Sequence, residues 1–97
     1  MAEVLFLTAA REEFLAAAEH YETASPGLGE AFVGEVVRAV SRIQTFPDHG
    51  SPYVAGSRRI VLQCFPFDVV YLRAEEHVLV VAVAHQRRSP YYWRQRL

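Results

Sequence analysis

The side chains that could do chemistry are concentrated near the C-terminus. Residues 85–96 read HQRRSPYYWRQR, a histidine followed by arginines and three aromatic residues. Metal-free cleavage of RNA needs a base for the 2′-hydroxyl proton, cations for the charged phosphorane and an acid for the leaving oxygen. Imidazole, guanidinium and phenol groups can fill these roles. If the chain is a nuclease, the candidate catalytic residues are His85, Arg59, Arg73, Arg87 and Tyr91.

The same segment could instead contact another protein. It carries four Arg and no Asp or Glu after residue 86, which favours an acidic partner segment. The candidate partner-binding residues are Arg87, Arg88, Tyr92, Trp93, Arg94 and Arg96. Trp93 has a second interpretation, because a large aromatic side chain can also anchor a tail on the body of a domain.

Several of these side chains also have a purely structural interpretation. His85 follows an apolar run and could satisfy its ring through backbone hydrogen bonds at a strand end. Arg58 and Arg59 point to opposite faces of any strand that contains them, so we expect one to be solvated and the other to pair with an acid on the second helix. The glutamate pairs 12–13 and 75–76 are expected on solvated faces or turns.

The charge of the chain is divided between its two halves. Residues 1–48 carry three Arg against eight Asp or Glu, a net charge of −5, and residues 49–97 carry seven Arg against three, a net charge of +4. All ten basic residues are Arg, so no lysine can serve as a proton donor or phosphate clamp. A basic half can meet either phosphate or an acidic protein surface, and the charges alone leave both partners open.

Length and composition predict one folded domain spanning residues 1–97, with 52% hydrophobic residues that exclude wholesale disorder. The single cysteine, Cys64, allows no internal disulfide, and the N-terminus does not resemble a secretory signal. The longest apolar run, residues 78–84, is too short to span a membrane as a helix. We therefore expect a cytoplasmic protein without a membrane partner.

Metal and cofactor sites are not expected. His20, His49 and His77 lie in separate predicted elements and lack the spacing of zinc ligands. Gly27 and Gly29 precede a helix but follow no strand, so they do not form a phosphate-binding loop.

The pattern of apolar residues predicts an α+β fold. We expect an N-terminal strand at residues 3–7, with Thr8 as N-cap and the glutamates 12–13 in the first turn of the helix that follows. That helix should end at residues 25–27, and a second helix should follow from Leu28 to form an antiparallel helical hairpin. Strand patterns at residues 59–65, 67–72 and 78–84 predict a three-stranded antiparallel meander. The helical hairpin should pack on one face of this sheet, and the first strand should join its edge. A short C-terminal helix is expected from Tyr91 to Arg96. Phe67 and Tyr71 share a strand face and should pack in the core.

This order of elements resembles the RelE/ParE toxin superfamily of bacterial type II toxin–antitoxin systems, in particular its ParE-like branch. The residues that carry the resemblance are Tyr21-Glu22 with residues 26–32, Ile43 with Phe46-Pro47, Arg58-Arg59, Phe65-Pro66-Phe67, Val70-Tyr71 and residues 81–93. The resemblance implies a toxin that is held inactive by a cognate antitoxin, as in plasmid stabilisation. RelE-like members cut messenger RNA on the ribosome, whereas ParE-like members act on DNA gyrase.

Three functions follow from the resemblance. The first is a growth-inhibiting toxin that binds a protein target such as gyrase. The second is a ribosome-dependent endoribonuclease that uses His85 and the arginines. This chain lacks the lysines of one RelE-like catalytic set, and between residues 47 and 57 Asp48 is the only acid that could stand for the glutamate of the other. The third is a relative that binds an antitoxin but is no longer toxic.

Overall fold

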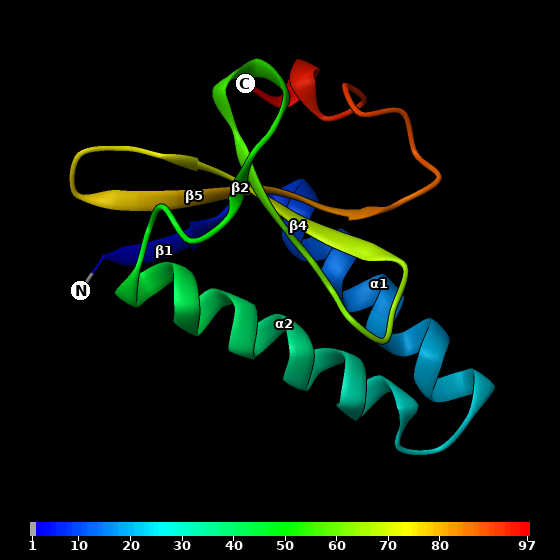
Figure 1. Cartoon of the computed structure of the whole chain (residues 1–97). Helices are drawn as coiled ribbons and strands as arrows, with labels where there is room; N and C mark the ends of the chain where they lie inside the picture. Colours follow the sequence, from blue (N-terminus) through cyan, green and yellow to red (C-terminus); the bar gives the residue numbers. More distant parts are fainter. Residues whose placement is uncertain (1) are drawn as a thin grey trace.

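Two helices form the antiparallel hairpin that the apolar spacing predicts. The computed structural model describes residues 2–97, in which α1 (Thr8–Ala24) and α2 (Leu28–Thr45) lie side by side beneath a sheet (Figure 1). The turn between them contains Gly27 at φ 88°, a left-handed conformation that glycine adopts without strain. The Glu22 carboxylate accepts hydrogen bonds from the backbone N–H groups of Gly27 and Gly29, at 3.0 and 3.1 Å, and so satisfies donors at the start of α2.

The beginning of α1 differs from the prediction. Thr8 is the first residue of the helix itself, Leu7 occupies the N-cap, and no side chain caps the helix. Glu12 and Glu13 therefore lie in the second turn. The prediction was wrong because the backbone carbonyl of Leu7 already accepts the N–H of Arg11, so the helix begins one residue earlier than the polar side chain suggested.

Five strands make one mixed sheet in the order β1-β5-β4-β3-β2. The strands are β1 (Glu3–Phe6), β2 (Ser51–Pro52), β3 (Arg58–Val61), β4 (Phe67–Arg73) and β5 (His77–His85). The meander of β3, β4 and β5 is antiparallel as predicted, and β1 joins its edge by pairing parallel to β5. The short strand β2 was not among the predicted strands, and its two residues pair with Arg58 and Arg59.

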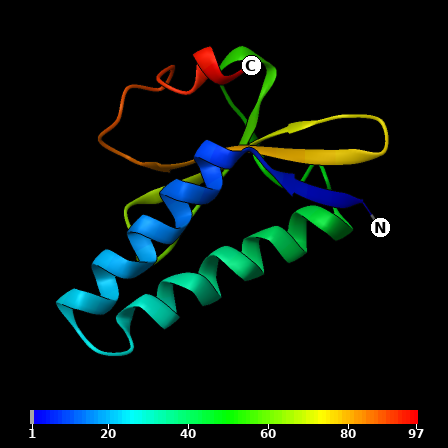
Figure 2. The same ribbon diagram turned by 180° about the vertical axis from the view of Figure 1, so that it is seen from behind.

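Each face of the sheet packs a different part of the chain. The helix side buries Phe32, Val36, Ile43, Val69 and Tyr71, and Phe67 packs against the same cluster as expected. The opposite face buries Val70, Val81, Ala82, Ala84 and Trp93. Figure 2 shows the C-terminal segment on this second side, next to the loop that follows β2 and away from α2.

The C-terminal segment is less helical than predicted. It runs through turns after Pro90 and ends in a single short 3₁₀ helix, η2 (Arg94–Arg96). Within residues 2–97, neither α-helix has the length and apolar character needed to cross a membrane.

Candidate functional site

The C-terminal tail is fixed to the sheet by Trp93. Its side chain is 1% exposed and packs with Val70, Val81, Ala82 and Ala84 on the face that the helices leave free. In this conformation Trp93 takes the anchoring role, one of the two interpretations that the sequence left open. Trp93 therefore offers almost none of its own surface to a partner in this conformation.

Glu13 on α1 provides the second attachment of the tail. The Arg96 guanidinium donates two hydrogen bonds to the Glu13 carboxylate, each 2.8 Å long, and the Tyr92 hydroxyl donates a third at 2.6 Å. The backbone N–H of Val83 donates to the same carboxylate at 3.1 Å. Glu13 was expected on a solvated face, and that expectation was wrong because its partners lie in a segment at the far end of the chain.

These contacts also cover an unpaired stretch of β5. Strand β1 pairs with β5 only as far as Val80, which leaves the next residues of β5 without a strand neighbour on that side. Glu13 accepts the N–H of Val83, and Arg96 donates to the carbonyl of Val81 at 2.9 Å. An ion pair thus takes the place of a strand at this edge.

The ionisation of this group is fixed by its contacts. Burial opposes charge on Glu13, but the hydrogen bonds from Arg96, Tyr92 and Val83 outweigh it and hold the pKa of the carboxyl below its ordinary value. Burial and the neighbouring carboxylate raise the pKa of Tyr92 far above its ordinary value. Tyr92 is therefore a neutral structural hydroxyl at physiological pH.

A basic cleft of about 360 Å³ lies between the tail and the sheet. One wall is Arg59, whose guanidinium lies 4.3 Å from the ring centre of Tyr53, and the other is Arg88, 3.9 Å from the ring centre of Tyr92. The lining also includes Val61, Asp68, Val70, Ala84, His85 and Trp93. We call this feature the basic cleft.

Asp68 orients Arg59 from the floor of the basic cleft. Asp68 is buried, with 4% of the residue exposed. Its carboxylate lies 3.2 Å from the Arg59 guanidinium and accepts a hydrogen bond from Gln86 Nε2 at 3.1 Å. The charge of Asp68 is therefore compensated within the protein.

Arg58 and Arg59 do point to opposite faces, but the expected partner on α2 was wrong. Arg58 lies 3.6 Å from Asp48 in the loop after α2 and donates to the Gly50 carbonyl at 2.7 Å. Arg59 pairs with Asp68 on β4. Each arginine therefore has an acidic neighbour, supplied by the loop after α2 and by β4.

His85 ends β5 with its ring against Phe67, the ring centres 5.2 Å apart. The backbone N–H of Arg87 donates to His85 Nδ1 at 3.1 Å. A ring nitrogen that accepts a hydrogen bond does so through its lone pair. The lone pair of Nδ1 is therefore occupied by a backbone hydrogen bond in this conformation.

Of the other proposed catalytic residues, Arg59 lines the basic cleft together with His85, whereas Arg73 does not. Arg73 lies at the opposite end of β4, since Phe67 is the residue that pairs with His85 and Arg73 pairs with Val78. Arg73 binds Asp48 at 2.7 Å, and this hydrogen bond lowers the pKa of the Asp48 carboxyl. The sequence could not reveal this separation without the strand register.

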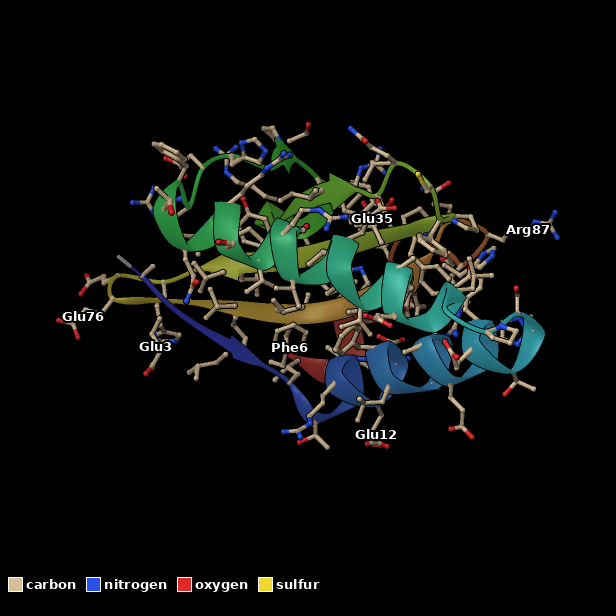
Figure 3. All side chains as sticks on the ribbon, turned by 90° about the horizontal axis from the view of Figure 1, so that it is seen from below. Glu3, Phe6, Glu12, Glu35, Glu76 and Arg87 are labelled. Atoms are coloured by element: carbon tan, nitrogen blue, oxygen red, sulfur yellow. The ribbon has the colours of Figure 1, made fainter. Side chains whose placement is uncertain are left out.

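The exposed cations form a separate group. Arg87 and Arg94 are exposed, and so is the neighbouring Tyr91. Figure 3 shows Arg87 extending away from the body of the protein. Arg88 is also exposed but lies over Tyr92 and borders the basic cleft. Arg59 and Arg88 thus place positive charge on both walls of the basic cleft, while Arg87 and Arg94 place it on the exposed surface.

Sequence reasoning missed Glu13, Asp68 and Tyr53. Asp68 gave a readable signal, because an acid within the apolar run FDVVYL of a strand requires a partner. Glu13 and Tyr53 gave none, since their contacts depend on how distant segments fold together.

Comparison with known proteins gives a family match and matches to solved structures. Residues 4–90 match the family model described as "ParE toxin of type II toxin-antitoxin system, parDE". Among solved structures, the chain is similar to one described as "Chromosomal ParDE TA system from P. aeruginosa". That match has a TM-score of 0.75 and 19% sequence identity, and it covers 88% of this chain and 96% of the other. No curated protein matches the chain in sequence.

Proposed function

Because the chain belongs to the ParE toxin family of type II toxin–antitoxin systems, we propose that it arrests growth by binding a protein target such as DNA gyrase, in the cytoplasm, without cutting RNA. The observation that carries this proposal is the hydrogen bond from the Arg87 N–H to His85 Nδ1. It occupies the lone pair that a catalytic base would need. Tyr92 is committed to Glu13, and Arg73 lies at the far end of β4, so the remaining candidates do not assemble a general acid–base pair.

A toxin of this kind is paired with an antitoxin protein. We propose that the exposed arginines Arg87, Arg88 and Arg94 contribute to the surface that the antitoxin covers. The half of the chain that contains them has a net charge of +4, which suits an acidic segment that folds upon binding. Tyr92, Trp93 and Arg96 act on this surface indirectly, because they hold the tail that carries Arg88 and Arg94.

The direct test of the target is a supercoiling assay with purified gyrase and relaxed plasmid. The toxin should inhibit supercoiling in proportion to its concentration, and the product of the neighbouring gene should relieve the inhibition. Full supercoiling at a large excess of folded toxin would remove gyrase as the target. Failure of the neighbouring gene product to co-purify with the toxin would reject that product as the antitoxin.

The endoribonuclease remains the second candidate, since His85, Arg59 and Arg88 line one cleft. It requires His85 to release its bond to Arg87 when RNA binds. Cleavage of a ribosome-bound message by the purified toxin, lost in His85→Ala, would establish this function in place of the first.

A further inference from the structure

We propose that the basic cleft binds a carboxylate side chain, together with an adjoining apolar side chain, from an acidic segment of the antitoxin. The proposal rests on the proposed function only in assigning the segment to the antitoxin. The carboxylate specificity itself follows from the walls and floor of the cleft.

The two walls of the cleft present guanidinium groups in fixed positions. Arg59 is held by Asp68 and lies over Tyr53, while Arg88 lies over Tyr92. Stacking on an aromatic ring restrains a guanidinium while leaving its edge free to donate to a planar acceptor. A carboxylate that enters between the walls can therefore accept hydrogen bonds from donors that are already oriented.

The charge balance of the cleft favours one added negative charge. Arg59 and Gln86 compensate Asp68, whereas Arg88 has no carboxylate within 4 Å among residues 2–97. Arg88 is thus the cation in excess. A single carboxylate would balance this one charge, whereas several phosphates would exceed it and leave uncompensated negative charge close to the buried Asp68.

The shape of the lining favours a peptide over a nucleotide. Val61, Val70 and Ala84 give the cleft an apolar portion that suits an aliphatic side chain. Val61 is 52% exposed, so this apolar surface is open to a partner. A guanidinium lies over one face of the Tyr53 ring and another over the Tyr92 ring, which reduces the aromatic surface on which a base could stack.

The test uses labelled ten-residue peptides and fluorescence anisotropy. One peptide alternates Glu and Leu, the second has Gln in place of each Glu, and a labelled ten-nucleotide single-stranded RNA is the third probe. The proteins are the full chain and its variants Arg88→Gln and Arg42→Gln. Both substitutions remove one exposed positive charge, but Arg42 lies on α2 and does not line the basic cleft.

The Glu peptide should bind the full chain and Arg42→Gln equally, and Arg88→Gln about tenfold more weakly. It should also bind at least tenfold more tightly than the Gln peptide. Equal binding to all three proteins, absence of binding, or tighter binding of the RNA through Arg88 would overturn the proposal. Trp93 fluorescence verifies that Arg88→Gln is folded, because this single tryptophan is buried beside the cleft.

The peptide result separates this inference from the proposed function. If the neighbouring gene product fails to bind any variant while the Glu peptide behaves as expected, the cleft is a carboxylate site and the assignment of the antitoxin is wrong. If the neighbouring product binds Arg88→Gln as tightly as the unaltered chain, the antitoxin is bound elsewhere and the inference fails.

Discussion

The carboxylate of Glu13 and the guanidinium of Arg96 form a bidentate ion pair across a separation of 83 residues. Arg96 also donates to the carbonyl of Val81, so the pair joins α1, the last 3₁₀ helix and the unpaired edge of β5. The tail that presents Arg88 to the basic cleft depends on this junction. Both the position of the tail and the stability of the fold should therefore depend on Glu13.

Glu13→Gln should loosen the tail. The substitution removes the charge that Arg96 and Tyr92 bind, and we expect the free energy of unfolding to fall by about 1–2 kcal/mol, since about a fifth of each side chain is still exposed and screened by solvent. Trp93 emission should shift to longer wavelength as the buried ring becomes hydrated. The matched control is Glu12→Gln, because Glu12 points away from the protein (Figure 3) and should change neither quantity. Identical stability of the two variants would show that the ion pair contributes nothing.

The attachment of the tail should depend on pH in the acid range. The pKa of Glu13 is lower in the folded protein than its ordinary value of 4.5, so its contribution to stability is complete above about pH 4.5 and is lost as the pH falls through the lowered value. An acid titration followed by Trp93 emission should therefore show the tail docked at pH 5 and released only below pH 4.5. The Glu13→Gln variant should lack this transition. The same acid midpoint in both proteins would assign the transition to another carboxyl group.

The helical hairpin should tolerate alanine at one glycine of α2 and not at another. A Cβ at Gly29 would lie 2.5 Å from the Ala18 carbonyl and 2.7 Å from Glu22 Cβ, so Gly29→Ala should destabilise the fold by about 1–3 kcal/mol. A Cβ at Gly34 would meet only the flexible end of Arg38 at 3.3 Å. Gly34→Ala should be neutral or stabilising by up to about 1 kcal/mol, because alanine favours a helix. Urea unfolding of both variants measures the change in the free energy of unfolding. A comparable loss of stability in both variants would contradict the prediction.

Much of the fold could be predicted from local patterns. The spacing of Phe32, Val36 and Ile43 identifies α2, and the short connections between the last three strand patterns permit only antiparallel neighbours. The pairing of β1 and the burial of Trp93 were also within reach of sequence reasoning.

The candidate site was harder to predict because its contacts are not local. The Glu13 carboxylate meets residues 70, 79 and 83 positions away, and no local pattern marks such partners. The register of β4 against β5 places Arg73 and His85 at opposite ends, although both follow strand patterns that look alike. Only the assembled sheet distinguishes a shared site from two separate ones.

His85→Ala should retain growth arrest. His85 Nδ1 accepts a backbone hydrogen bond and its ring packs on Phe67, so the substitution removes a turn contact and no catalytic base. Arrest is measured by induction in cells without the antitoxin, with protein level and Trp93 fluorescence as controls for folding. The matched substitution is His49→Ala, at an exposed histidine outside the basic cleft. Loss of arrest in a folded His85→Ala protein, with His49→Ala still active, would contradict the proposed function.

The most direct measurement is to map the 5′ ends of cellular messages after the unaltered chain is induced without its antitoxin. The proposed function predicts intact messages together with a DNA damage response and filamentation. New message ends at ribosomal positions, appearing with a rapid loss of translation and before any DNA damage response, would contradict it. Normal growth with folded protein present would instead identify a relative that binds its antitoxin but is not toxic.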